Sequence, residues 1–344
     1  MKEQAIIPIF IPHMGCPFDC IFCNQGQITA RGKPESMDDI ILTIETLLET
    51  IEKKGLQNVE IAFYGGSFTG LPIAIQQEYL GIAKKYKDQG RVNGIRLSTR
   101  PDYINDEILL NLKEYGVDLI ELGVQSFDEE VLLKSKRGHS REIVYESSEL
   151  IKRYGFKLGI QLMIGLPGDS HEKSVKSAME TTVISPDVAR IYPTIVIKGT
   201  GLEALLEKGE YSPLSLDEAV ETAKDMYLIL KNAGISVIRM GLKSSDNIAE
   251  GKAILGSTFH PAFRQLVESL VAREDLERQI DPNCKTVTFY SKKESLSNMI
   301  GNKGSNREYF NNKYPRINFS FKVDNDLDTG IYKATNLPYS KAKA

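Results

Sequence analysis

Three of the four cysteines in this chain stand within eight positions of one another, in the stretch PHMGCPFDCIFCNQ. They are Cys16, Cys20 and Cys23, in the spacing CxxxCxxC. Thiolates in such a short loop suit a 4Fe–4S cluster, because the loop can wrap three corners of the cluster and leave the fourth iron open. The alternatives are a zinc site completed by His13 or Cys284, and a set of small buried side chains. The gap between Cys16 and Cys20 favours the cluster.

The composition indicates where these thiols reside. Of the 344 residues, 41% are hydrophobic and 26% are charged, a balance typical of a globular protein. No apolar run approaches the roughly 18 residues of a membrane helix, and the first residues do not resemble a signal peptide. We therefore expect a cytoplasmic protein with reduced thiols and no disulfide framework. The net charge of −3 gives no global sign of nucleic-acid binding, so such binding must depend on a local surface.

An open iron requires other parts of the chain to supply a binding site. Runs rich in β-branched residues alternate with runs of helical periodicity, which predicts βα units and a parallel sheet. The predicted strands are 6–11, 59–66, 94–100, 119–126, 157–165, 188–196 and 235–242, and the main helices are 37–54, 72–89, 106–116, 140–153, 171–182 and 216–234. We expect an α/β fold: a partial or open TIM-type (β/α)6 barrel over residues 1–242, followed by a small extension over residues 243–344.

Polar and glycine-rich motifs follow the predicted strands. After the cysteine loop come GGSFTG, STRPD, QSFD, GLPGD and YPT, each where a strand ends. The carboxyl ends of parallel barrel strands form one rim, and barrel active sites lie there. The motifs therefore predict one composite site.

These motifs, in this order, resemble the radical S-adenosylmethionine (SAM) superfamily over about residues 5–240. Within it the chain is similar to the radical-SAM half of the elongator catalytic subunit, through TRPDYI (99–104), LIELGVQSFDEEVLLKSKRGHS (119–140) and IYPTIVIKGTGLEALLEKGEYSPLSLDEAV (191–220). The resemblance implies a 4Fe–4S cluster and SAM as cofactors, and an external electron donor such as flavodoxin or ferredoxin. It implies reductive cleavage of SAM to a 5′-deoxyadenosyl radical in a transferase that modifies tRNA. About 100 residues follow the barrel, too few for the acetyltransferase domain of that subunit.

The resemblance also assigns residues. Cys16, Cys20 and Cys23 would bind the cluster. The residues that would contact SAM are Phe22, Gly65, Gly66, Ser67, Ser98, Gln125, Arg137, Gln161 and Tyr192. Arg137 suits the methionyl carboxylate, whereas Ser98 stands where relatives often carry a carboxylate. A tight turn at the two glycines, interior polar packing of the glutamines, a solvated arginine and core packing of the tyrosine are the structural alternatives. His13 and His139 are candidates for supporting or substrate roles.

The C-terminal region suggests the substrate. Its last 60 residues hold eleven basic and five acidic residues, counted from the sequence, interleaved with aromatic residues. Such a mixture can contact phosphates and stack on bases, so the sequence predicts contacts of Lys303, Arg307 and Lys313 with RNA phosphates and stacking of Tyr309 and Phe310. A small β-rich cover with a solvated face is the alternative. GVQSF and GLPG also keep a small-molecule enzyme of the oxygen-independent coproporphyrinogen oxidase type under consideration, and a non-catalytic metal-binding module is the third hypothesis.

Overall fold

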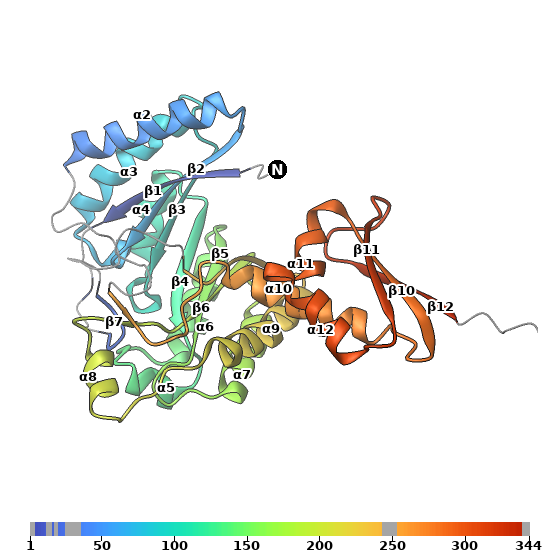
Figure 1. Ribbon diagram of the computed structural model, residues 1–344. Coiled ribbons are helices and arrows are strands. Elements are labelled where there is room, and N and C mark those ends of the chain that lie inside the picture. Colours follow the sequence, from blue (N-terminus) through green and yellow to red (C-terminus); the bar gives the residue numbers. More distant parts are fainter. Residues whose placement is uncertain (1–3, 12–15, 17–19, 25–35, 243–252, 339–344) are drawn as a thin grey trace, which may run out of the picture. The chain divides into compact units, whose positions relative to one another are not determined.

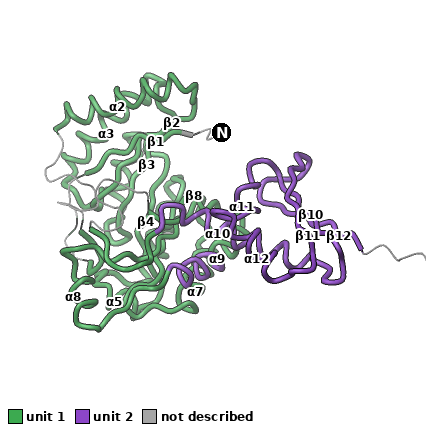
Figure 2. The backbone as a smooth tube through the Cα atoms, in the orientation of Figure 1, with its two compact units in different colours: residues 1–215, 226–259 green, residues 216–225, 260–344 purple. Residues whose placement is uncertain are grey.

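The computed structural model describes residues 4–11, 16, 20–24, 36–242 and 253–338. It contains two compact units, which Figure 2 distinguishes by colour: residues 1–215 with 226–259, and residues 216–225 with 260–344. The predicted boundary between residues 242 and 243 adjoins a segment outside the described residues, and it stays a prediction. Within the described part of the chain, no helix has both the length and the apolar character needed to span a membrane.

The first unit is built on a curled parallel sheet (Figure 1). Its seven strands have the order β1-β2-β3-β4-β5-β6-β8, and all neighbours run parallel. The strands are β1 (Gln4–Ile11), β2 (Asn58–Gly65), β3 (Gly94–Thr99), β4 (Leu119–Gln125), β5 (Lys157–Ile164), β6 (Val188–Pro193) and β8 (Ser236–Met240). This arrangement confirms the predicted α/β fold with a partial TIM-type barrel. A short antiparallel pair, β7 (Val196–Ile197) and β9 (Ile254–Leu255), stands apart from that sheet.

Helices connect these strands in the expected alternation. They are α2 (Met37–Lys53), α3 (Ile73–Asp88), α4 (Asp106–Glu114), α5 (Glu129–Lys134), α6 (Arg141–Arg153), α7 (His171–Ile184), α8 (Gly201–Glu207) and α9 (Leu216–Asn232). Helix α2 shows why they form: Ser36 and Asp39 make a capping box at its start, and Ile40, Ile44 and Leu48 recur every four residues on its buried face.

The two faces of the sheet differ in chemistry. On β2, Ile61 and Phe63 are fully buried, and the Phe63 ring contacts Tyr79 of α3. Glu60 and Tyr64 alternate with these residues, so they point to the opposite, inner face. The helix-covered face therefore holds the apolar core, and the inner face holds polar side chains.

The second unit has its own core. Helices α10 (Phe263–Glu277), α11 (Leu296–Ile300) and α12 (Ser305–Lys313) accompany a three-stranded sheet in the order β11-β10-β12. Its strands are β10 (Cys284–Ser291), β11 (Asn318–Val323) and β12 (Tyr332–Pro338). The rings of Phe289 and Phe310 lie 4.8 Å apart at the centre of this core, and both side chains are fully buried.

This core corrects one expectation. The prediction that Phe310 stacks on RNA bases is wrong, because its exposed fraction is 0%. The hydroxyl of Tyr309 donates to Glu277 at 3.0 Å, and its ring lies under the guanidinium of Arg273 at 4.5 Å. Lys313 forms an ion pair with Glu277 at 2.7 Å. Helix α12 therefore uses these groups to hold the second unit together.

Candidate functional site

The site begins at the carboxyl end of the first three strands, where the cysteine loop meets neighbouring segments. The backbone N–H of Ser67, which follows β2, donates to Cys16 Sγ at 3.2 Å. The Nη1 of Arg137 donates to Cys20 Sγ at 3.0 Å, although 117 positions separate the two residues. Cys23 closes a turn by donating its N–H to the carbonyl of Cys20 at 2.9 Å. The structure thus brings two predicted cysteines against two predicted SAM-contact residues.

Positive charge surrounds Cys20. The Nε and Nη2 of Arg100 donate to the two carboxylate oxygens of Asp102, each at 2.9 Å. The guanidinium of Arg100 therefore has a carboxylate partner. Arg137 is only 5% exposed, and within the described residues it has no carboxylate at ion-pair distance. Its Nη2 donates to the carbonyl of Gly123, while its buried Nε has no hydrogen-bond partner there. A buried cation of this kind needs an anion close by, and a cluster bound through Cys20 Sγ would provide one.

The donor chemistry fits a thiolate-bound cluster. Burial raises the pKa of Cys16, whereas the N–H of Ser67 and the charges of Arg100 and Arg137 oppose that rise. Among the described residues, no three side chains of ligand type converge closely enough to enclose a metal ion. The structural support for a cluster therefore comes from Cys16 Sγ and Cys20 Sγ, which accept N–H hydrogen bonds. Such donors to sulfur stabilise bound clusters and tune them.

A glycine turn brings the chain close to the cysteine loop. Gly65 has a φ of +108°, and a Cβ at this position would lie 2.8 Å from the carbonyl oxygen of Ile11. Gly66 follows it, and then Ser67 donates to Cys16. The Ser67 hydroxyl is 2.7 Å from that of Thr99 and accepts from the Arg100 backbone N–H at 3.2 Å. The turn between β2 and α3 is thus tied to the end of β3.

Two predicted glutamines form a pair further along the rim. The amide of Gln161 on β5 donates to the side-chain oxygen of Gln125 at 3.2 Å. Gln125 has a positive φ of 72°, at a point where the register between β4 and β5 shifts. A Cβ on Gly123 would lie 3.0 Å from the Gln125 amide, so a glycine leaves room for that side chain. Ser98 is partly exposed on β3 and makes no side-chain hydrogen bond within the described residues.

Tyr192 belongs to a buried network that the sequence analysis missed. Arg190 donates to Glu121 with both Nε and Nη2, to the hydroxyl of Tyr64 at 2.8 Å and to that of Tyr192 at 3.1 Å. Arg96 extends this network, because it pairs with Glu60 and lies 3.7 Å from Glu121. The sequence contained a signal for this network, because each of these charged residues stands within a mostly apolar strand. The network connects β2, β3, β4 and β6 across the inner face.

Two further candidates are Phe22 and His139. The Phe22 side chain packs against Val196, Leu202 and Tyr211, in an apolar cluster formed by β7 and α8. His139 is buried, its Nδ1 contacts the Ser140 carbonyl at 3.1 Å, and its Nε2 has no partner within the described residues. Burial, followed by the charge of Arg137, lowers the pKa of His139 to about 4. His13 lies outside the described residues.

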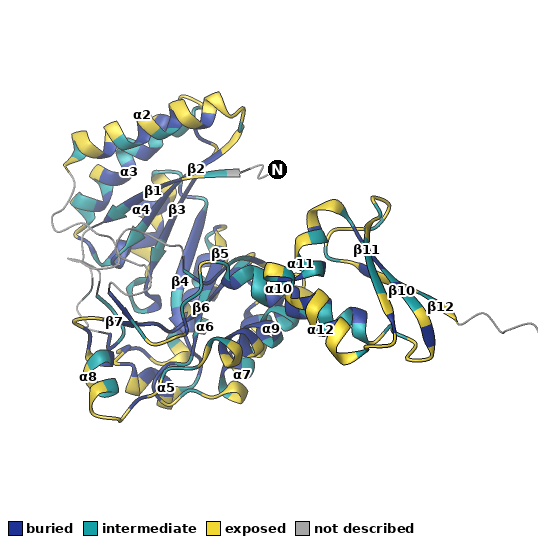
Figure 3. Cartoon of the chain, in the orientation of Figure 1, coloured by how far each residue is buried: buried dark blue, intermediate teal, exposed yellow. Residues whose placement is uncertain are grey.

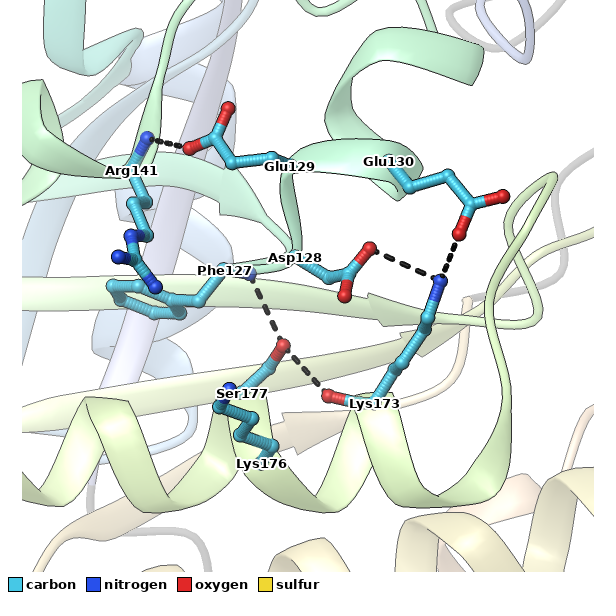
Figure 4. A pocket seen from close by; sticks show the side chains of 8 residues that line it. All are labelled: Phe127, Asp128, Glu129, Glu130, Arg141, Lys173, Lys176 and Ser177. Atoms are coloured by element: carbon cyan, nitrogen blue, oxygen red, sulfur yellow. Dashed lines mark hydrogen bonds and ion pairs between the residues drawn. The ribbon is translucent and has the colours of Figure 1, made fainter.

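One surface hollow lies elsewhere in the first unit. It has a volume of about 280 Å³ and is lined by Phe127, Asp128, Glu129, Glu130, Arg141, Lys173, Lys176 and Ser177 (Figure 4). Lys173 bridges Asp128 at 3.2 Å and Glu130 at 2.6 Å, so its charge is already compensated. The hollow contains none of the predicted cofactor residues.

Comparisons with known proteins identify the family of this chain. The radical SAM superfamily model matches residues 10–179, and the radical SAM C-terminal domain model matches residues 186–273. An uncharacterized protein of Methanocaldococcus jannaschii is 31% identical over 233 residues, which cover 64% of this chain and 70% of that protein.

Named relatives match this chain in sequence, and a solved structure matches it in fold. A tRNA uridine(34) acetyltransferase of Methanocaldococcus infernus is 29% identical over 255 residues, 63% of this chain and 48% of that protein. The chain thus spans about half the length of the named relatives it matches. The fold resembles that of M. infernus Elp3 with an N-terminal deletion, at a TM-score of 0.63 and 24% identity, covering 80% of this chain and 64% of that one. The chain belongs to the radical SAM superfamily, whose enzymes use SAM and a 4Fe–4S cluster.

Proposed function

We propose that this protein binds a 4Fe–4S cluster through Cys16, Cys20 and Cys23, cleaves SAM reductively and modifies RNA, with tRNA as its substrate. The observation that carries the proposal is the pair of N–H···S contacts at the sheet rim, to Cys16 from Ser67 and to Cys20 from Arg137. When bound, the cluster supplies the electron that cleaves the SAM sulfonium and yields a 5′-deoxyadenosyl radical. The residues of this chain hold and surround these groups.

Arg137 has the central electrostatic role in this proposal. Its Nη1 donates to Cys20 Sγ at 3.0 Å, so it would help to hold a cluster bound through that sulfur. Its unpartnered Nε leaves one donor for an anionic group of SAM, such as the methionyl carboxylate. The Nη2 of Arg100 donates to the backbone carbonyl of Arg137, and this contact helps to fix the backbone that carries the Arg137 side chain.

Other rim residues position SAM. Gly65 allows the backbone to turn beside Ile11, which leaves Gly66 and Ser67 facing the cysteine loop. Gln125 and Gln161 retain donors and acceptors beyond their mutual hydrogen bond, and Ser98 offers a hydroxyl from the neighbouring strand. We assign these residues, with Tyr192 and Phe22, to SAM binding by the resemblance of their motifs. The radical chemistry then requires only that SAM and substrate be held in near contact and shielded from water.

The proposed RNA substrate is supported by the named relatives. Proteins about 29% identical to this chain are named tRNA uridine(34) acetyltransferases, and the Elongator complex protein 3 of Dictyostelium discoideum is 30% identical over 248 residues. Mass spectrometry of tRNA nucleosides from cells with and without the gene tests this part. A nucleoside that disappears with the gene supports a tRNA substrate, and an unchanged nucleoside profile contradicts it.

Cysteine variants test the cluster. Replacing Cys16, Cys20 or Cys23 with Ala should abolish the broad visible absorption of anaerobically reconstituted protein and its release of 5′-deoxyadenosine. Cys284→Ala is the matched control, because Cys284 is buried in the second unit with its Sγ 3.7 Å from the Asn336 side-chain oxygen. The assignment is wrong if the Cys284 variant loses the cluster while a loop variant keeps it.

A further inference from the structure

The sheet of the second unit has one covered face and one open face. On its central strand β10, Val287, Phe289 and Ser291 are buried, whereas Thr286 and Tyr290 are partly exposed. Helices α10, α11 and α12 contact the strands, and the rings of Phe319 and Phe321 lie against Phe289 on the same side. Figure 3 shows the corresponding mixture of buried and exposed positions along β10, β11 and β12. The face opposite the helices is therefore available to a partner.

The strand register places two lysines beside one tyrosine on that open face. Tyr290 pairs with Lys322 of β11 on one side and with Lys333 of β12 on the other. In the antiparallel pair of Tyr290 and Lys333 the Cβ atoms lie about 5 Å apart. In the parallel pair of Tyr290 and Lys322 the strands lie about 4.8 Å apart. Both lysines are exposed, and neither amine forms an ion pair or hydrogen bond with a described residue. The row therefore has the Tyr290 ring at its centre and, on each side, a lysine amine without a partner among the described residues.

The remainder of the open face is uncharged. The next row consists of Thr335, Thr288 and Ser320, and the Ser320 hydroxyl donates to Thr288 at 2.9 Å. The third row pairs Thr286 with Asn318 and Leu337. None of these positions carries a carboxylate. A further exposed lysine, Lys285, stands at the β-bulge next to this third row.

Acidic residues limit the surface at one end. Asp324, Asp326 and Asp328 lie in the connection from β11 to β12, beyond the Lys322–Tyr290–Lys333 row. Their charges repel a polyanion, so a bound strand should run from that row toward Lys285. From Tyr290 to Lys285 the strand extends about 17 Å at about 3.3 Å per residue.

We propose that this open face of the β10–β11–β12 sheet is an RNA-binding surface, with a base stacked on Tyr290 and phosphates contacted by Lys322 and Lys333. The proposal rests on the RNA substrate proposed above and names the surface that binds it. An aromatic ring between cations matches the alternation of base and phosphate in single-stranded RNA, and hydroxyl and amide side chains can bond to sugar and base edges. It replaces the earlier expectation for α12, whose Phe310 is buried and whose Lys313 is paired with Glu277.

Binding of an unmodified tRNA transcript to the full-length, cluster-loaded protein over a series of salt concentrations tests the surface. The double variant Lys322→Gln, Lys333→Gln should reduce the slope of log affinity against log salt by about two units, one for each phosphate contact. Tyr290→Ala should weaken binding by about tenfold with little change in slope, whereas Tyr290→Phe should bind like the parent.

The matched control is Arg278→Gln with Lys303→Asn, which removes two positive charges from the same unit. Arg278 is exposed and paired with Asp275 at 3.3 Å, and Lys303 has a φ of +53°, which asparagine tolerates. The control should keep the parent slope within about half a unit. Cluster absorption and thermal unfolding should match the parent in every variant.

The outcomes of this experiment distinguish a failure of the proposed surface from a failure of the proposed RNA substrate. Loss of affinity in the face variants but not in the control supports the surface. If the parent binds tRNA and the face variants bind it equally well, the surface proposal is overturned while the RNA substrate stands. If the parent does not bind tRNA, the RNA substrate itself is contradicted. Equal competition by polyglutamate would show a general anion surface and would also overturn the proposal.

Discussion

The inner face of the seven-stranded sheet and the open face of the three-stranded sheet both carry charged side chains, but they hold them differently. In the first unit Glu121 is 3% exposed and pairs with Arg190 and Arg96, so its charge is compensated inside the protein. In the second unit Lys322 and Lys333 are exposed and unpaired within the described residues. Buried paired charges fix the positions of strands, whereas exposed unpaired charges are available to a ligand.

The largest effect is expected at the buried network. Glu121→Ala leaves Arg190 and Arg96 buried without this carboxylate, so the free energy of unfolding should fall by about 3–5 kcal/mol. Denaturant unfolding of the parent and the variant measures this change. Gly159 supports this interpretation, because a Cβ there would lie 2.8 Å from Glu121 Cγ, and the neighbouring strand thus leaves space for the carboxylate side chain.

An exposed glutamate provides the control for that prediction. Glu49 on α2 is paired with Lys53 at 4.0 Å, and its side chain is 70% exposed. Glu49→Ala should therefore change the free energy of unfolding by less than about 0.5 kcal/mol. A Glu121 variant that is destabilised no more than the Glu49 variant would show that the inner charges do not hold the strands.

The second prediction concerns His139, whose pKa falls to about 4 through burial and then through the charge of Arg137. Between pH 6.5 and 4 the unfolded chain binds a proton that the folded protein does not, so stability decreases as the pH falls through this window. At pH 5 the loss relative to pH 7 should be about 2 kcal/mol from this group alone. Denaturant unfolding at both pH values measures the loss.

A histidine comparison isolates this effect. His139→Gln should lose about 2 kcal/mol less than the parent between pH 7 and pH 5, because the buried imidazole is gone. An unchanged pH dependence in the His139 variant would show that Arg137 and the surrounding residues do not oppose its protonation.

The main strands and helices of the first unit could be predicted from the sequence because each has a local signal, whereas the short elements α5, α8, β7 and β9 were not predicted. The isoleucines and leucine of α2 recur at helical spacing, and Gly65, the last residue of β2, has a positive φ that other residues rarely adopt. The contact between Cys20 and Arg137 was not predictable from spacing, since 117 positions separate them and only the tertiary fold brings them together.

The missed features depend on pairing between distant segments. Glu121 and Arg190 stand on strands β4 and β6, so the sequence revealed two isolated charges rather than one pair. Helix α12 has a mostly polar sequence, SNREYFNNK, and only Asn306 and Phe310 are buried in it. Its composition therefore suggested an exposed basic segment, although these two residues, four positions apart, face the core.

The smallest effect on stability is expected at the open face, and this prediction sharpens the contrast between the two faces. Lys322→Gln with Lys333→Gln removes no ion pair or hydrogen bond with a described residue. The free energy of unfolding should therefore change by less than about 0.5 kcal/mol, as at most exposed sites. Denaturant unfolding at low and high salt measures this, beside the loss of tRNA affinity expected for the same variant. A destabilisation above about 1 kcal/mol would mean that these lysines support the sheet. The two faces would then share one role, because charges on both would serve the fold, and the tRNA result could no longer be assigned to direct contact.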